Sequence, residues 1–102
     1  MLIFNTTYHV EDNAHDEFFK HLTLIYIPKA VSSGFLHSPC FSCIRPQHEQ
    51  SGKSYSLQLK VKNTDTLNHW LSTEGEQLHN EIVNKFGEKV VGFVTLMDEI
   101  SL

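Results

Sequence analysis

SYSLQLKVK, residues 54–62, is the stretch that decides the fold of this chain. Its apolar residues are Tyr55, Leu57, Leu59 and Val61, and each is separated from the next by a polar residue. This period of two is typical of a β-strand whose two faces differ in polarity. The stretch therefore predicts a sheet with one apolar side and one distinctly polar side.

Three further stretches have strand character. Residues 2–10 alternate in the same way, and their even-numbered residues form the apolar face. Residues 36–45 form a weaker strand, which we expect at an edge because Pro39 cannot donate a hydrogen bond to the ladder. Residues 89–98 are apolar almost without a break, which favours a strand that is central or buried on both faces.

The first of two expected helices follows residues 2–10. Asp12 or Asn13 can cap its free amides, and acidic residues follow in the first turn. Pro28 interrupts the pattern, which predicts a kink or a new short helix that ends before Gly34.

The second helix is expected between the last two strands. It runs from Thr64 or Asp65, as the capping residue, to Lys85, and Phe86-Gly87 ends it. The polar, turn-rich residues 46–53 are expected to form the hairpin loop before residues 54–62.

The predicted order is strand, helix, strand, strand, helix, strand over one domain, residues 1–102. This is the βαββαβ order of the ferredoxin-like α+β fold, in which a four-stranded antiparallel sheet carries two helices on one face. The other face must meet something else, and a second copy would complete a dimeric α/β barrel. The residues expected on that face are Ile3, Asn5, Thr7, Ser56 and Gln58.

Three short segments carry a resemblance to a known family. They are residues 3–7 (IFNTT), residues 26–28 (YIP) and residues 85–89 (KFGEK), which a strand follows. Over essentially the whole chain the sequence resembles a family of uncharacterised bacterial proteins of about 100 residues. That family is similar to the dimeric α/β-barrel superfamily, so the resemblance implies a fold and a homodimer but no catalytic residue.

Composition excludes two classes of partner. The chain has 102 residues, a formal net charge of -4, and eight Lys and Arg residues scattered singly, so we expect no nucleic acid partner. No stretch resembles a secretion signal or is long enough to span a bilayer, so we expect no membrane partner and a soluble, cytoplasmic protein.

Cys40 and Cys43 have the spacing of a redox pair or half of a zinc site. On an extended strand, however, residues three apart point to opposite faces, so we expect neither a shared metal nor a disulfide. A loop at this position would reverse that expectation. The other histidines of the chain, His21 apart, lack paired ligand spacing, and we expect most to be solvated, no metal site and no cofactor. The sequence leaves open a metal site that is assembled only in three dimensions.

His21 and Glu74 each interrupt the apolar stripe of a predicted helix. If both face the sheet, they could pair as a catalytic base and its orienting carboxylate, with a raised pKa for His21. The alternative is that Gly75 breaks the helix and turns Glu74 to water, while His21 lies at the edge of the core and bonds to backbone.

Two functions remain open on this evidence. The first is a homodimeric module for small-molecule binding or assembly, with an apolar or aromatic ligand in a pocket lined by Tyr8, Tyr26, Tyr55 and Trp70. The second, by analogy with the fold alone, is a cofactor-independent oxygenase-like or isomerase-like enzyme that uses His21.

Overall fold

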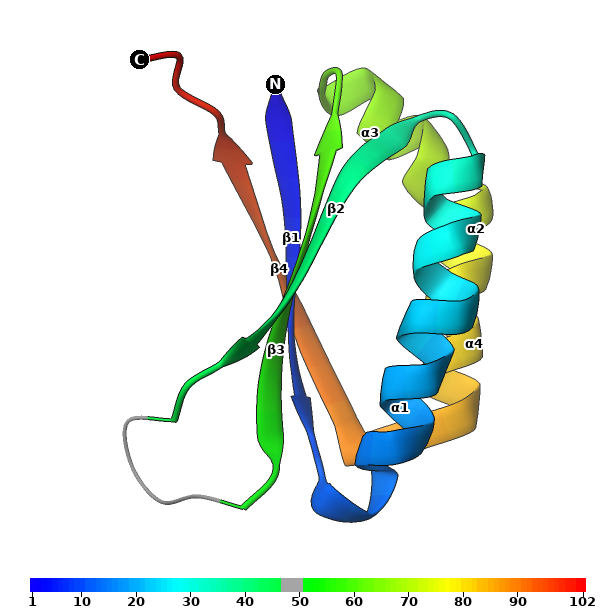
Figure 1. The fold of residues 1–102 in the computed structure, drawn as a ribbon. Coiled ribbons are helices and arrows are strands. Elements are labelled where there is room, and N and C mark those ends of the chain that lie inside the picture. Colours follow the sequence, from blue (N-terminus) through cyan, green and yellow to red (C-terminus); the bar gives the residue numbers. More distant parts are fainter. Residues whose placement is uncertain (47–50) are drawn as a thin grey trace.

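The computed structural model describes residues 1–46 and 51–102, so the predicted hairpin loop at 46–53 and His48 fall partly or wholly outside the described residues. The described residues form a four-stranded sheet and two helical runs (Figure 1). In chain order the elements are β1 (Leu2–Val10), the 3-10 turn η1 (Asp12–Ala14), α1 (His15–His21), the π-helical segment η2 (Leu22–Tyr26), α2 (Ile27–Ser32), β2 (Leu36–Ile44), β3 (Lys53–Val61), α3 (Thr64–Leu71), α4 (Glu74–Phe86), the 3-10 turn η3 (Gly87–Lys89) and β4 (Val90–Asp98).

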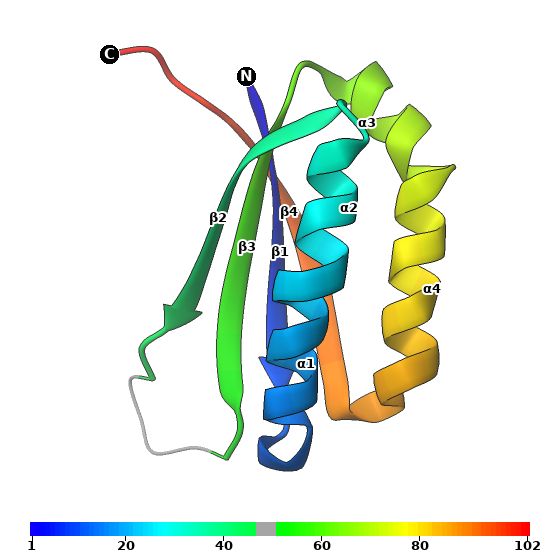
Figure 2. The same ribbon diagram turned by 45° about the vertical axis from the view of Figure 1, so that its right-hand side comes forward.

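The strands form one antiparallel sheet in the order β2-β3-β1-β4. Both helical runs cover the same face of this sheet, as Figures 1 and 2 show from two directions. The predicted ferredoxin-like α+β fold is confirmed, and so is the edge position of β2. The ladder between β2 and β3 is irregular between His37 and Cys40, where Ser38 has a positive φ of 55° and Pro39 follows.

The prediction that the last strand is central or buried on both faces is wrong. In the described sheet β4 pairs with β1 alone and lies at an edge. Val91 and Phe93 are 58% and 63% exposed on one face, and Val94 is 54% exposed on the other. The continuous apolar pattern was misleading because βαββαβ topology places the first and third strands in the middle, whatever the composition of the last.

The first helical run continues through Pro28, which lies at the start of α2. Just before it, the helix widens into the π-helical segment η2, where the amide of Ile27 donates to the carbonyl of Leu22, five residues back. The run begins with a 3-10 turn, and no side chain caps it among the described residues, so the predicted cap at Asp12 or Asn13 is wrong. Gly34 follows the end of α2 with a φ of 82°, as the sequence predicted.

The second helical run is divided, where the sequence predicted one continuous helix. Asn63, one residue before the predicted candidates, caps α3 by accepting a hydrogen bond from the amide of Thr66 at 2.8 Å. The run then breaks at Ser72-Thr73, whose hydroxyls both donate to the carbonyl of His69, at 3.0 and 2.8 Å. Such side-chain bonds compete with the helical ladder and favour an end to the helix.

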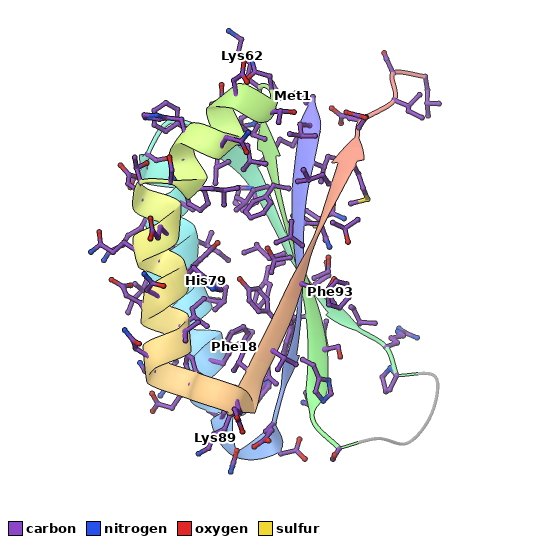
Figure 3. The ribbon with its side chains drawn as sticks, turned by 180° about the vertical axis from the view of Figure 1, so that it is seen from behind. Met1, Phe18, Lys62, His79, Lys89 and Phe93 are labelled. Carbon is purple, nitrogen blue, oxygen red and sulfur yellow. The ribbon has the colours of Figure 1, made fainter. Side chains whose placement is uncertain are left out.

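The core lies between the sheet and the helices. Figure 3 shows Phe18 in this layer and Phe93 on the other side of the sheet. The strand register places Asn5 opposite Gln58 and Thr7 opposite Ser56, which confirms that these residues share the helix-free face. No helix in the described part of the chain is long and apolar enough to cross a membrane.

Candidate functional site

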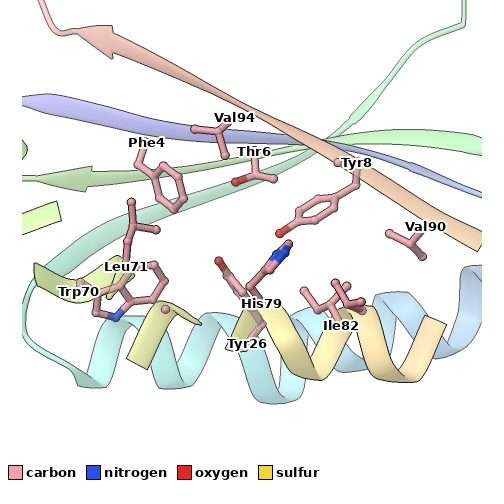
Figure 4. Close-up of a pocket in the computed structure, with 13 residues that line it drawn as sticks. Phe4, Thr6, Tyr8, Tyr26, Trp70, Leu71, His79, Ile82, Val90 and Val94 are labelled. Atoms are coloured by element: carbon pink, nitrogen blue, oxygen red, sulfur yellow. The ribbon is translucent and has the colours of Figure 1, made fainter. Parts of the chain in front are cut away.

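A cavity of about 160 Å³ lies between the sheet and the helices at the β4 edge. Figure 4 shows it from the side, with the strands β1 and β4 above and the helices below. The residues that line it are Phe4, Thr6, Tyr8, Tyr26, Trp70, Leu71, Gly75, His79, Ile82, Val83, Val90, Gly92 and Val94. Since β4 is an edge strand, the cavity lies beside the free edge of the sheet.

Most of the cavity wall is apolar. Phe4 and Trp70 meet edge to face, with ring centroids 6.1 Å apart and an interplanar angle of 67°. Two glycines make room for the aromatic rings. A Cβ atom on Gly75 would lie 2.7 Å from the Trp70 ring, and one on Gly92 would lie 3.1 Å from the ring of Tyr8. A side chain at either position would therefore displace a ring that lines the cavity.

One part of the wall is polar. It contains the hydroxyls of Thr6, Tyr8 and Tyr26 and the imidazole of His79. Figure 4 shows the His79 ring and the hydroxyls of Tyr8 and Tyr26 pointing into the same part of the cavity. The Tyr8 hydroxyl lies close to the hydroxyls of Tyr26 and Thr6. An apolar cavity with a few convergent polar groups is the usual form of a small-molecule site.

Burial keeps the two tyrosines of this cluster neutral. It raises the pKa of Tyr26 to about 12, and it raises the pKa of Tyr8 well above its ordinary value of 10.0. Proximity to the Tyr26 hydroxyl raises the pKa of Tyr8 further, since two phenolates cannot lie side by side without repulsion. Near neutral pH both hydroxyls therefore carry their hydrogens and can donate as well as accept.

Local structure explains how these groups converge. Thr6 and Tyr8 are two residues apart on β1 and so share its helix-covered face. Tyr26 is the last residue of the π-helical segment, whose wider turn shifts the register of the residues beyond it. His79 lies one turn beyond Gly75 on α4, on the same side of the helix as Ile82 and Val83.

The structure brings together three of the four residues predicted to bind a ligand. Tyr8, Tyr26 and Trp70 line the cavity, and Tyr55 does not. Tyr55 lies on the same face but on β3, next to β2 and farther from β4, where its ring stacks on Phe41 with centroids 5.1 Å apart. Its hydroxyl is hydrogen-bonded to the imidazole of His15. Apolar alternation placed both Tyr8 and Tyr55 on the correct face, but it carries no information about position across the sheet.

The predicted pair of His21 and Glu74 does not form. Glu74 is exposed at the start of α4, and both ring nitrogens of His21 lack a hydrogen-bond partner among the described residues. The alternative from the sequence was right that Glu74 is exposed, but wrong that Gly75 breaks the helix, since the break lies at Ser72-Thr73 and Gly75 is buried within α4. It was wrong for His21, which has no bond to backbone.

His21 is instead an unpaired histidine in the core layer. It is only 5% exposed, and its ring meets Phe86 edge to face at 5.8 Å. Burial lowers the pKa of His21 from its ordinary value of 6.5, and the positive charge of Lys85 lowers it further. The upward shift of this pKa was expected only if His21 paired with Glu74, and that pair does not form. The negative charge of Glu81 raises the pKa of His21, but by less than burial and Lys85 lower it.

Sequence reasoning missed His79, Thr6 and the two glycines of the cavity wall. The sequence grouped His79 with the solvated histidines, and His79 as a whole is indeed exposed. The signal that could have found it is its spacing from Leu71, Gly75 and Ile82, which recur at helical intervals. The break after Leu71 hides this pattern in a reading that assumes one continuous helix.

The strand register confirms that Cys40 and Cys43 point to opposite faces. Cys40 pairs with Gln58 on the helix-free face, and Cys43 pairs with Tyr55 on the helix-covered face. Both are exposed, free cysteines. Within residues 1–46 and 51–102, no three His, Cys, Asp or Glu side chains are grouped closely enough to hold a metal ion.

Fold and cavity together define a ferredoxin-like α+β protein with a ligand-sized cavity under its sheet. Solved structures with this fold include an ethyl tert-butyl ether D (EthD) family protein from Bacillus halodurans, with a TM-score of 0.71 and 14% identity over 98% of this chain and 100% of that one. An antibiotic biosynthesis monooxygenase has a TM-score of 0.69 and 17% identity over 99% of this chain and 100% of that one. A dimeric ferredoxin-like protein from an uncultured marine organism has a TM-score of 0.68 and 11% identity over 100% and 97%.

The chain itself belongs to the family described as "Domain of unknown function (DUF4286)", whose model matches residues 1–100. The resemblance inferred from the sequence is thereby confirmed. No curated protein matches the sequence. At 11–17% identity the solved structures establish the fold and leave the activity open.

Proposed function

We propose that this protein is a homodimeric small-molecule-binding protein. Each copy holds a small apolar or aromatic ligand in the cavity between α4 and the β1–β4 edge of the sheet. The observation that carries the proposal is the composition of the cavity wall, in which aromatic and aliphatic side chains surround a compact group of three hydroxyls and one imidazole. A merely structural core has no need of such a space, because interiors are packed as densely as organic crystals.

The helix-free face of the sheet supports the proposed dimer. Val91 and Phe93 are more than half exposed there, beside a half-polar surface. That surface is ordered by hydrogen bonds of its own, since Ser56 donates to Asn5 at 2.6 Å and Asn5 donates to Thr7 at 3.2 Å. Exposed apolar side chains next to satisfied polar ones are typical of an interface between two copies. One solved structure of this fold is described as dimeric.

Two measurements test this proposal. Sedimentation of the purified chain should give twice the mass of 102 residues at micromolar concentration. Titration of the ¹⁵N-labelled protein with toluene should shift the amide signals of cavity residues such as Gly75 and Gly92, and leave those of Cys40 and Ser42 unchanged. A monomer would refute the dimer, and the absence of shifts at the cavity would refute the ligand site.

A second candidate function is a cofactor-independent oxygenase-like or isomerase-like enzyme. His79 favours it, because an imidazole beside two neutral hydroxyls can accept a proton from a bound molecule. His21, which the sequence suggested as the base, does not line the cavity. Oxygenation of hydroquinone by dioxygen to hydroxybenzoquinone and water balances without a further reductant, because the substrate supplies all the electrons. Oxygen uptake that depends on the protein, places one atom of ¹⁸O from ¹⁸O₂ in this product and is lost in His79→Gln would support this candidate. Uptake equal to that of hydroquinone alone would exclude this oxygenase reaction.

A further inference from the structure

The polar part of the cavity wall specifies a ligand more closely than its apolar part does. We infer that the ligand of this cavity is a neutral phenol, with its ring against Phe4 and Trp70 and its hydroxyl among the side chains of Tyr8, Tyr26 and His79. This inference rests on the proposed function of the cavity as a ligand site. It adds the chemical class of the ligand. That class follows from the size of the cavity, the absence of charged residues among the described residues of its wall and the hydrogen-bonding capacity of its polar groups.

Size limits the ligand to about one ring. The cavity measures about 160 Å³. An apolar cavity of about 150 Å³ in a protein core is large enough to bind benzene. The aromatic rings of Phe4 and Trp70, set edge to face, offer both faces and edges to a third ring. A flat, single-ring molecule therefore fits this space better than a bulky aliphatic one.

Charge excludes an ionised ligand. Among the described residues that line the cavity there is no Lys, Arg, Asp or Glu. A carboxylate or an ammonium group would enter without a partner of opposite charge, and burial of an unpaired charge is strongly unfavourable. The ligand is therefore neutral when bound, as a phenol is near neutral pH.

The three hydroxyls of the cavity wall can both donate to a ligand and accept from it. Thr6, Tyr8 and Tyr26 each supply one O–H donor and the lone pairs of one hydroxyl oxygen. Even when the three hydroxyls bond one another in a row, one O–H and several lone pairs remain. His79 adds one donor and one acceptor in its neutral form. A ligand that both donates and accepts, as a hydroxyl does, satisfies this set, whereas a ketone or an ether can only accept.

The test compares three probes of nearly equal size on the intact protein: phenol, toluene and benzoate. Tyr26→Phe removes one of the three cavity hydroxyls and keeps the ring. The matched control is Tyr55→Phe, which removes a tyrosine hydroxyl outside the cavity. We expect Tyr26→Phe to weaken phenol binding by about three- to tenfold, the size of one net hydrogen bond, and to leave toluene binding unchanged. Tyr55→Phe should change neither, and benzoate should bind to no form.

The outcomes separate this inference from the proposed function. If toluene binds at the cavity but Tyr26→Phe leaves phenol unaffected, or weakens phenol and toluene equally, the phenol inference is overturned and the ligand site stands. Stronger binding of benzoate than of phenol also overturns it. If neither phenol nor toluene binds, the proposed function itself fails. If Tyr26→Phe does not fold, Tyr8→Phe provides the same test with a second cavity hydroxyl.

Discussion

Tyr8 on β1 and Gly92 on β4 lie directly opposite each other, and a Cβ atom on Gly92 would approach the Tyr8 ring to 3.1 Å. Because Gly92 has no side chain, the tyrosine ring and the neighbouring cavity occupy the space that a side chain would otherwise fill. Gly92→Val should fill this space and lower the affinity for toluene by tenfold or more, while the strand itself is preserved because valine favours β structure.

The control for this change is Thr95→Val on the same strand. Thr95 pairs with Asn5, so its side chain lies on the helix-free face, away from the cavity. Ligand binding should be unchanged in this variant. Calorimetric titration measures both affinities, and equal affinities for Gly92→Val and the unmodified protein would contradict the proposed location of the ligand.

Phe93 provides the test of the dimer. It is 63% exposed on the helix-free face of β4. Burial of a phenylalanine contributes about 1.5–3 kcal/mol, and a symmetric dimer contains two such side chains. Phe93→Lys should therefore convert the dimer to a monomer at micromolar concentration, as measured by analytical ultracentrifugation.

Leu24 is the matched control, since it is 72% exposed on the helical side of the molecule. Leu24→Lys should remain dimeric. A Phe93→Lys variant that sediments like the unmodified protein would show that the helix-free face is not the interface.

The buried His21 should make stability depend on pH. Its pKa is lowered in the folded protein relative to an ordinary value of 6.5, mainly by burial, so the unfolded chain binds more protons as the pH falls below about 6.5. The contribution of neutral His21 is fully present above that pH and is lost as the pH falls toward its folded pKa. Urea unfolding at one protein concentration should therefore show lower stability at pH 5.5 than at pH 7.5.

His21→Leu removes this dependence and also removes two buried nitrogens that have no hydrogen-bond partner among the described residues. The difference in stability between the two pH values should shrink in this variant. His69→Leu, at an exposed position against Phe35, serves as the control and should behave like the unmodified protein. An unchanged difference in His21→Leu would mean that other groups cause the loss at low pH.

Gly75 fixes the packing between α3 and α4. An added Cβ atom would lie 2.7 Å from the Trp70 ring and 2.9 Å from the Trp70 carbonyl oxygen. Gly75→Ala should therefore lower the free energy of unfolding by about 1–3 kcal/mol, although alanine favours helices, because an overpacked core must shift backbone and side chains. A lowered midpoint in thermal unfolding checks this, with exposed Gln77→Ala on the same helix as the control. A stabilised Gly75→Ala would show that Trp70 can move freely.

The sequence was sufficient for the order of elements and the two faces of the sheet, because alternation at residues 54–62 reports burial directly. It was misleading for β4, whose apolar residues lie at an edge and face outward. A local pattern shows that a side chain is apolar, and it does not show whether that side chain lies in the core or on an exposed edge strand.

The candidate site was predictable only in part, for a related reason. Tyr8, Tyr26 and Trp70 follow from their places in apolar stripes, whereas Glu74 and His79 depend on where the second helical run breaks. That break follows from hydroxyl bonds of Ser72 and Thr73 to a single carbonyl. Such bonds are weak local preferences that become decisive only when the tertiary structure is in place.

Because of the π-helical segment Leu22–Tyr26, the direction in which Tyr26 points depends on the exact number of residues in the first helical run. A π turn accommodates one residue more than an α turn, and each residue of an α-helix advances the side chains by about 100°. Deletion of a single exposed residue such as Leu24 would restore a regular helix and rotate Tyr26 relative to His21 and the residues before it. An insertion or deletion of one residue would thus change the polar part of the cavity wall, by exchanging the hydroxyl of Tyr26 for a neighbouring side chain while the strands are preserved.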